Sequence, residues 1–434
     1  MVEPLQRRTV AAYAAAVAPM AILSLPFSIY LPPFIAEGGV LSVATIGLLF
    51  SVSAAWDGIV DPIIGSVIDR VRAGDAPHRI WMLRAAMPLA LLLALLISFG
   101  EQSPAWILLP ILLLFYSFYS LFDVAHLSWG SALAQTPDDS SRLFGARELG
   151  GKIAVVLAFA APAIIQAIDP GISIEGRIIA YAAIAFLAIP LALVAIYQLP
   201  PRAIMPQPGI GWRAEIAATL RSRPLVLLLA VQLTNAFAFG SLTALFVFFV
   251  NAWLRLDQVS SLILFLTFIG GAVAAPFWTA AARRIAKPRL MIAMPLWLIA
   301  ILLGGLLVEP GSVAQAIVFS GTLGTGFVGL IFIYGMVSDL APTDAQTCGR
   351  DRTAFLFAIV NVIQKIGVSL AIAVSYVLLD LGGFDPLNQP ASADLVRLLF
   401  LLTPATAWTV MIVLLLLLSR EPMFRTTQAK GLLA

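Results

Sequence analysis

Long apolar stretches, each of about 20 residues, recur along this chain and constrain its fold more than any other feature. A helix needs roughly 20 apolar residues to cross the hydrocarbon core of a bilayer, which is about 30 Å thick. Of the 434 residues, 61% are hydrophobic and only 11% are charged, against about 25% charged residues in an ordinary soluble domain. The sequence therefore predicts a multi-pass membrane protein, whose first apolar stretch we expect to be a membrane span rather than a cleaved signal peptide.

Twelve stretches have the length and composition of membrane-spanning helices, six on each side of a polar segment rich in Pro and Arg. We expect an all-α membrane protein with an N-terminal six-helix bundle (1–199), a solvated linker (200–223) and a C-terminal six-helix bundle (224–434). The twelve predicted spans are 10–34, 41–67, 80–99, 104–130, 147–168, 177–199, 224–250, 259–280, 290–308, 313–338, 353–380 and 396–418.

Basic residues between the spans predict the side of the membrane on which each loop lies, because loops rich in Lys and Arg stay in the cytoplasm. Of the 26 Lys and Arg residues, 22 fall at the termini, in the even-numbered loops or at the ends of the spans next to these loops. Both termini are therefore expected in the cytoplasm. The exceptions are Arg177, Arg255 and Arg397 in odd-numbered loops, and Lys365 inside a span.

Four ionisable residues lie well inside predicted spans: Asp57, Asp61, Asp123 and Lys365. A charge at mid-bilayer costs at least about 2.5 to 3.5 kcal/mol on insertion scales, so each of them should have a partner, a water-filled cavity or a function. Three acids and one base cannot all pair one to one. The excess of acids leaves room for a mobile cation or proton as the missing positive charge.

Asp57 and Asp61 are four residues apart and therefore share one face of a helix, with about 5 to 6 Å between their Cβ atoms. Two carboxylates so close in a low dielectric do not both stay ionised without compensation: one takes a proton, or a small cation lies between them. Pro62 would free a backbone carbonyl as a further oxygen ligand. In the alternative interpretation, both acids pair with basic residues near the cytoplasmic end of the helix.

A polar stripe runs along the predicted span 104–130, where Tyr119, Ser120, Asp123 and His126 share one face and Trp129 follows. Such a stripe should face the bundle interior. A carboxylate accepts hydrogen bonds from hydroxyl groups and an aromatic ring stacks on the apolar side of a sugar, so the stripe suits a polyhydroxylated substrate. Alternatively, it makes hydrogen bonds between helices without a ligand. His126 is either a packed histidine or a proton carrier.

Two other spans carry basic and amide side chains. Arg147, beside Glu148 near the start of its span, either turns toward Asp123 or extends to the lipid headgroups. Asn361 lies one turn before Lys365, and we expect it to contribute to the substrate site. We expect Lys365 to face the carboxylates of the span 41–67 across the pore.

The segment Gly65-Ser-Val-Ile-Asp69-Arg70, at the end of the second predicted span, resembles the Gly-x-x-x-Asp-Arg signature of the major facilitator superfamily. A glycine there permits close helix contact, and an aspartate can pair with a basic residue or a helix end. Gly65, Asp69 and Arg70 are therefore predicted to form a structural motif. The resemblance implies two six-helix halves that transport a substrate by alternating access.

Three further segments resemble the glycoside-pentoside-hexuronide:cation symporters, the melibiose permease-like branch of this superfamily. They are Trp56-Asp57-x-x-x-Asp61-Pro62-x-x-Gly65, Tyr119-Ser120-x-x-Asp123, and the region from Ser338-Asp339 to Gln364-Lys365-Ile-Gly367. The resemblance implies cation-coupled symport of a sugar or glycoside. It assigns Asp57, Asp61 and Ser120 to the cation site, Asp123 and Arg147 to the substrate site, and Lys365 to the coupling of the two.

The chain departs from this family at three places. Val60 stands where sodium-using members often have Asn, so we expect H⁺ as the coupling ion, with Na⁺ as the alternative. The span 10–34 lacks the acid that binds sugar in melibiose permease, which leaves an amphipathic substrate such as a lysolipid, or export, as alternative functions. The predicted cytoplasmic loop Ala341-Pro342-Thr343-Asp344 lacks the usual tyrosine.

The numbers of cysteine and histidine residues exclude some classes of protein and site. One cysteine and two histidines exclude a disulfide framework and a thiolate metal cluster. The sequence shows no nucleophile motif and no Gly-rich phosphate loop, so we expect neither an enzyme nor a cofactor. The expected partners are a small-molecule substrate and the lipid bilayer, without nucleic acid. The predicted state is a monomer in the cytoplasmic (inner) membrane.

Overall fold

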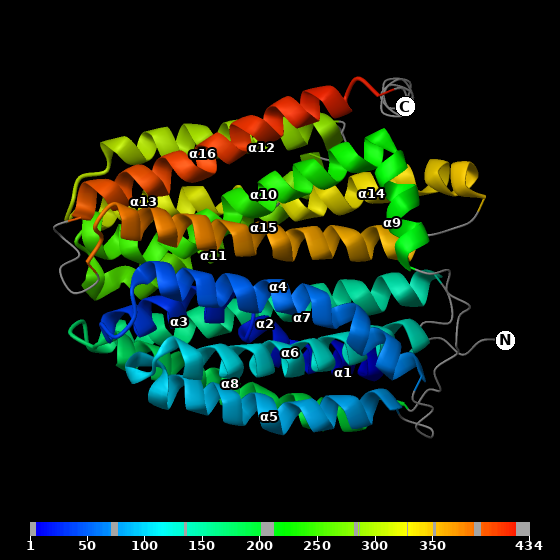
Figure 1. Cartoon of the computed structure of the whole chain (residues 1–434), viewed down its shortest axis with the longest axis horizontal. Helices are drawn as coiled ribbons and strands as arrows, with labels where there is room; N and C mark the ends of the chain where they lie inside the picture. Colours follow the sequence, from blue (N-terminus) through cyan, green and yellow to red (C-terminus); the bar gives the residue numbers. More distant parts are fainter. Residues whose placement is uncertain are drawn as a thin grey trace. The chain divides into compact units, whose positions relative to one another are not determined.

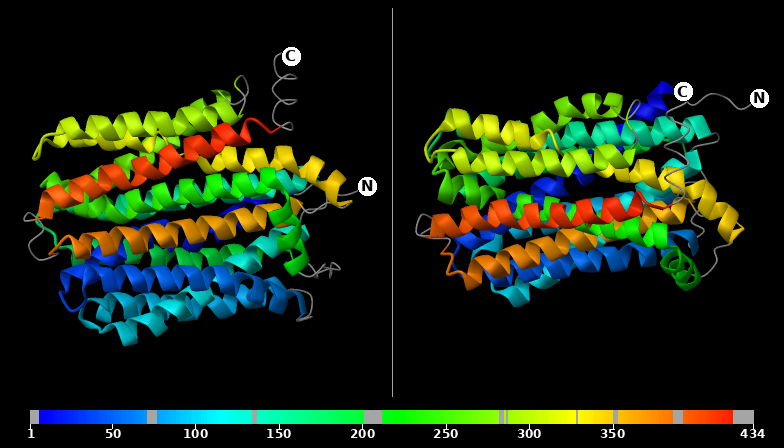
Figure 2. Two further views of the ribbon diagram at one scale, coloured as in Figure 1. Left: turned by 45° about the horizontal axis from the view of Figure 1, so that its top comes forward. Right: turned by 90° about the horizontal axis from the view of Figure 1, so that it is seen from above.

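The computed structural model describes residues 6–70, 77–133, 137–200, 212–281, 285, 287–327, 329–349, 353–385 and 392–421. All regular elements within these ranges are helices. The chain divides into two units: unit 1 comprises Met1–Gln207 and Gln258–Phe265, and unit 2 comprises Pro208–Asp257 and Leu266–Ala434. Within each unit, long helices run side by side (Figures 1 and 2).

Unit 1 begins with three short helices where the sequence predicts one span: α1 (Arg7–Ala16), α2 (Ala18–Ile22) and α3 (Leu25–Glu37). Prolines account for the breaks, since Pro19 and Pro26 lie in the first turns of α2 and α3, where a missing backbone N–H is tolerated. The unit continues with α4 (Val43–Arg70), α5 (Pro77–Phe99), a 3₁₀ turn (Gly100–Gln102), α6 (Ala105–Leu133), α7 (Pro137–Ile168) and α8 (Ile174–Gln198).

The first helix of unit 2, α9 (Trp212–Arg221), lies inside the predicted solvated linker 200–223. Residues 201–211 of that segment lie outside the described ranges. The elements that follow are α10 (Arg223–Phe248), a π-helical turn (Phe249–Trp253), a 3₁₀ turn (Asp257–Val259), α11 (Ser260–Ala281), α12 (Lys287–Gly304), a 3₁₀ turn (Gly305–Leu307), α13 (Val313–Gly324), α14 (Gly329–Cys348), α15 (Thr353–Leu381) and α16 (Ala393–Leu418). Of these, the stretch Gln258–Phe265, which includes the start of α11, belongs to unit 1.

Eleven helical stretches of the described residues are long and apolar enough to cross a membrane, against twelve predicted. The difference arises at the predicted span 313–338, which the structure divides between α13 and α14. Glycine weakens a helix by roughly 0.5 to 1 kcal/mol relative to alanine, and four glycines fall between positions 321 and 329. The predicted loop 341–344 is also wrong, because α14 continues through it to Cys348.

Glycines let α11 and α13 pack with their backbones in contact. A Cβ atom on Gly324 would lie 1.7 Å from the carbonyl oxygen of Thr267, and one on Gly270 would lie 2.1 Å from the carbonyl oxygen of Gly321. Small residues at helix contacts are typical of membrane bundles, where close packing replaces the hydrophobic effect as the force between helices. Position 324 is therefore restricted to glycine.

We predict that Gly324→Ala lowers the free energy of unfolding by about 1 to 3 kcal/mol, the range for overpacking a tight contact. Gly321→Ala is the matched control, because it lies on the same helix and its added Cβ meets nothing within 4 Å; we expect it to stay within about 0.5 kcal/mol of the wild type. Thermal unfolding of both purified variants in one detergent checks this. Equal unfolding temperatures would contradict the packing of α11 on α13.

Candidate functional site

Asp57 is nearly fully buried on α4, with 4% of its surface exposed. Ser120 on α6 donates a hydrogen bond from its Oγ to Asp57 Oδ1. Next to this contact, the indole N–H of Trp56 donates to Ser117 Oγ at 2.9 Å. Two adjacent polar contacts thus join α4 to α6, and they bring together two of the three residues predicted for a cation site.

Asp61, the third predicted cation-site residue, lies one turn further along α4 and is half-buried. Tyr119 on α6 lies within electrostatic range of Asp57 and Asp61. The two carboxylates therefore border the same part of unit 1. Gly65, Asp69 and Arg70 form the predicted structural motif further along α4. The side chains of Asp69 and Arg70 lie outside what the structure describes, as does that of Pro62.

Asp123 on α6 and Arg147 on α7 form an ion pair, with Arg147 Nη2 at 2.5 Å from Asp123 Oδ1. The two sequence alternatives for Arg147 are thereby resolved, since it turns toward Asp123 and does not extend to lipid headgroups. The side chains keep 24% and 16% of their surface exposed. A charge-assisted pair of this kind is strong, yet both partners remain accessible to a ligand.

His126 lies one turn after Asp123 on α6 and is fully buried. Its ring stacks on that of Tyr13 of α1, with 4.2 Å between ring centroids. Arg147 Nε donates to His126 Nδ1 at 3.4 Å, and His126 Nε2 lies 3.0 Å from the carbonyl oxygen of Tyr13. The histidine is therefore packed and connects the ion pair to α1. Sequence reasoning did not identify Tyr13, because nothing local to α1 indicates a partner on α6.

Trp129 lies apart from these residues. It is fully buried, and its indole N–H donates to the carbonyl oxygen of Pro200 at 3.2 Å. On α5, the ring of His78 stacks on its indole and the guanidinium group of Arg79 lies over the indole. It follows Asp123 by six residues, which turns it to a different face of α6. The site on unit 1 therefore does not include Trp129.

Unit 2 contributes a second polar group, on α15. Tyr334 of α14 donates to Asn361 Oδ1 at 2.5 Å, and Gln232 Nε2 of α10 donates to Gln364 Oε1 at 2.5 Å. Lys365 follows Gln364 on the same helix and is half-buried. The expectation that Lys365 faces the carboxylates of α4 remains a prediction. Gln232 and Gln364 were missed, although an uncharged amide inside an apolar stretch is a signal that sequence reasoning can use.

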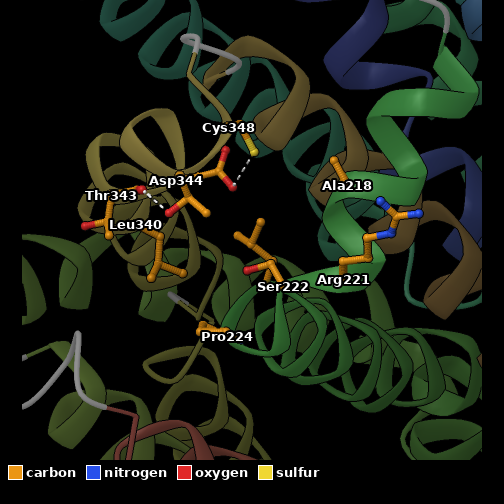
Figure 3. A pocket seen from close by; sticks show the side chains of 10 residues that line it. Ala218, Arg221, Ser222, Pro224, Leu340, Thr343, Asp344 and Cys348 are labelled. Atoms are coloured by element: carbon orange, nitrogen blue, oxygen red, sulfur yellow. Dashed lines mark hydrogen bonds between the residues drawn. The ribbon is translucent and has the colours of Figure 1, made fainter.

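A pocket of about 330 Å³ lies elsewhere in unit 2, between α9, the start of α10 and α14 (Figure 3). Its lining includes Arg221, Leu340, Asp344 and Cys348, and the thiol of Cys348 lies 3.9 Å from Asp344 Oδ1. None of the residues predicted for the cation or substrate site lines this pocket.

Residues 12–426, nearly the whole chain, match a family model described as MFS/sugar transport protein. A curated relative from Synechocystis sp. (strain PCC 6803), described as an uncharacterized symporter, is 24% identical over 185 residues. That match covers 41% of this chain and only 34% of the relative's length.

Solved structures show the same fold. The nucleoside transporter NupG is 12% identical, with a TM-score of 0.67, and the match covers 95% of this chain and 100% of NupG. A proton-dependent oligopeptide transporter is 16% identical, with a TM-score of 0.65, and the match covers 97% of this chain and 100% of the transporter. The Escherichia coli fucose:proton symporter FucP is 14% identical, with a TM-score of 0.54, and the match covers 95% of this chain and 98% of FucP. At these identities the likeness concerns the fold alone.

The family match covers far more than half of the chain, and the fold is that of transporters. The chain therefore belongs to the MFS/sugar transport protein family, which corresponds to the melibiose permease-like branch of the major facilitator superfamily, and it is a multi-pass membrane protein of a transporter family.

Proposed function

We propose that this protein is a proton-coupled symporter of a sugar or glycoside, which works by alternating access and has both termini in the cytoplasm. The observation that carries this proposal is the presence of two carboxylate centres on unit 1. One is Asp57 with Ser120, and the other is Asp123 with Arg147. Tyr119 lies within electrostatic range of both centres.

The first centre suits the coupling ion. Asp57 is buried inside a membrane span and accepts a hydrogen bond from the hydroxyl group of Ser120. An ionised carboxylate in a low dielectric is stabilised by a counter-charge or neutralised by a proton. Val60 adds no side-chain oxygen for a sodium ion, so we propose a proton shared by the Asp57 and Asp61 region, with Na⁺ as the alternative.

The second centre suits a polyhydroxylated substrate. A carboxylate accepts hydrogen bonds from hydroxyl groups, and a guanidinium group donates them to hydroxyl oxygens. Tyr116 and Tyr119, with ring centroids 6.4 Å apart, place aromatic surface on α6 next to Asp123 for the apolar face of a sugar ring. Asp123 and Arg147 compensate each other's charge, which favours a neutral ligand.

Coupling follows from the closeness of the two centres. A proton at Asp57 and a substrate at Asp123 both change the electrostatic field at Tyr119. If the bound proton raises the affinity for the substrate, the bound substrate raises the affinity for the proton by the same factor. FucP, which shares the fold, is described as a fucose:proton symporter, and this supports the proposed coupling of a sugar to a proton.

A second candidate is transport of an amphipathic substrate such as a lysolipid. Its support is the predicted span 10–34, which carries no acid. Within it, the ring of Phe27 of α3 stacks on Phe115 of α6 with centroids 4.4 Å apart. A span without a carboxylate to accept hydrogen bonds from sugar hydroxyl groups favours a ligand with an apolar part.

Uptake into proteoliposomes tests the proposal. The panel consists of radiolabelled glycosides, sugar acids and one lysolipid, each measured under an imposed proton gradient and an imposed sodium gradient. We expect a glycoside to accumulate under the proton gradient. Accumulation only under the sodium gradient would contradict H⁺ as the coupling ion. Transport of the lysolipid without transport of any sugar would favour the second candidate.

A further inference from the structure

His126 contacts Arg147, the arginine of the proposed substrate site, but the proposed function assigns no role to His126. The ring is completely buried, and polar atoms meet it on both sides. Arg147 Nε approaches Nδ1 at 3.4 Å, and the carbonyl oxygen of Tyr13 approaches Nε2 at 3.0 Å. These two neighbours decide which ring nitrogen carries a proton.

The chemistry of the neighbours allows one arrangement. A guanidinium group only donates hydrogen bonds, so Nδ1 accepts and carries no proton. A carbonyl oxygen only accepts, so Nε2 carries the proton and donates it. His126 is therefore a neutral imidazole in the Nε2–H tautomer. A second proton on Nδ1 would point at the positive charge of Arg147.

Tyr13 holds the ring in this orientation. Its phenol donates to the carbonyl oxygen of His126 at 3.2 Å, and the two rings lie 16° from parallel. A Cβ atom at Gly130, one turn after His126, would lie 2.1 Å from the phenol oxygen of Tyr13. The glycine thus leaves the space that the phenol needs to reach His126.

Arg147 is consequently held at two points. Its Nη2 contacts Asp123 at 2.5 Å and its Nε contacts His126. When a substrate hydroxyl competes with Arg147 for Asp123, the contact to His126 keeps the guanidinium plane in place. We propose that His126 is a positioning residue that orients Arg147 toward the substrate and takes no part in carrying the coupling proton. The substrate part of this inference rests on the proposed function.

Nitrogen NMR of the full chain, labelled with ¹⁵N-histidine in lipid nanodiscs, tests the arrangement without any substrate. The chain has only two histidines, so His78→Gln assigns both signals. We expect His126 as the neutral Nε2–H tautomer, with an Nδ1 signal that moves in Arg147→Lys. Arg79→Lys is the matched control, because Arg79 lies over Trp129 on the side of His78, and it should leave the His126 signal unchanged. An Nδ1–H tautomer or an imidazolium in the wild type would overturn the inference.

Two substitutions distinguish a positioning role of His126 from a packing role. The measurement is the KM for uptake of a glycoside identified by the panel described above. His126→Asn keeps an acceptor near the place of Nδ1, whereas His126→Phe keeps the ring and loses the acceptor. Positioning predicts that Phe raises KM at least tenfold, that Asn restores most of the loss, and that the number of protons moved per substrate stays unchanged in both. If Phe is tolerated and Asn is not, the residue serves packing alone and the proposal fails. If no glycoside moves while NMR shows the expected tautomer, the proposed function fails and the assignment of His126 as the anchor of Arg147 stands.

Discussion

Asp57→Asn is expected to lower substrate accumulation driven by a proton gradient at least tenfold, while exchange of substrate without a gradient stays measurable. Asparagine has nearly the shape of aspartate and still accepts the hydrogen bond from Ser120 Oγ, but it neither binds the coupling proton nor carries charge. We expect the same result for Asp61→Asn. Uptake under an imposed gradient, compared with counterflow in its absence, separates coupling from binding.

The control for this prediction is Asp169→Asn, which alters an exposed carboxylate in the turn between α7 and α8. Its accumulation should equal that of the wild type. Ser120→Ala removes the hydroxyl donor and leaves the charge of Asp57, so we expect an intermediate loss. Full accumulation in both Asp57→Asn and Asp61→Asn would show that the coupling ion binds elsewhere.

Arg177→Ala is expected to raise the reaction rate of a cysteine at position 261 with a thiol reagent at least tenfold. Ser261 is 1% exposed, and its backbone N–H donates to Gln166 Oε1 at 2.8 Å. Arg177 Nη1 donates to Ser260 Oγ at 2.5 Å. These contacts hold the first turn of α11 within unit 1, whereas α11 from Leu266 onward belongs to unit 2. If the units move as the proposed alternating access requires, these contacts break or α11 bends.

The measurement uses Ser261→Cys in a Cys348→Ser background, which is clean because the chain has one cysteine. A maleimide that does not cross membranes, applied to vesicles of either orientation, also reports on which side this end of α11 lies. The control is Arg397→Ala, another exception to the charge rule, whose guanidinium donates to the carbonyl oxygen of Leu306 at 2.8 Å and lies over Trp253. Equal labelling rates in Arg177→Ala and the control would contradict a holding role for Arg177.

The structure explains two of the three arginines that lie in odd-numbered loops against the positive-inside rule. Arg177 and Arg397 are bonded within the protein, so their positions reflect packing of the bundle more than a choice of membrane side. Arg255 is exposed and adopts a left-handed backbone with φ of 55°. The positive-inside rule counts loop charges without regard to such contacts.

Local properties of the sequence predicted the class of protein and pointed to the polar residues of the candidate site. Apolar stretches predicted the helices because crossing a bilayer requires length and hydropathy that a window of about 20 residues already contains. Asp57, Ser120, Asp123 and Arg147 stood out because a polar or charged group in an apolar span is costly unless it has a function. Helical spacing then showed which residues of one helix share a face.

Only the tertiary structure decided which helices these faces meet. Arg147 had two open directions until α7 was seen against α6, and Tyr13 became a partner of His126 across 113 residues of sequence. The place of Trp129 against α5, and the close packing of α13 on α11, likewise depend on neighbours that no local pattern specifies. The physical reason is that burial costs are properties of single segments, whereas hydrogen-bond partners and close contacts are properties of pairs of segments brought together by the fold.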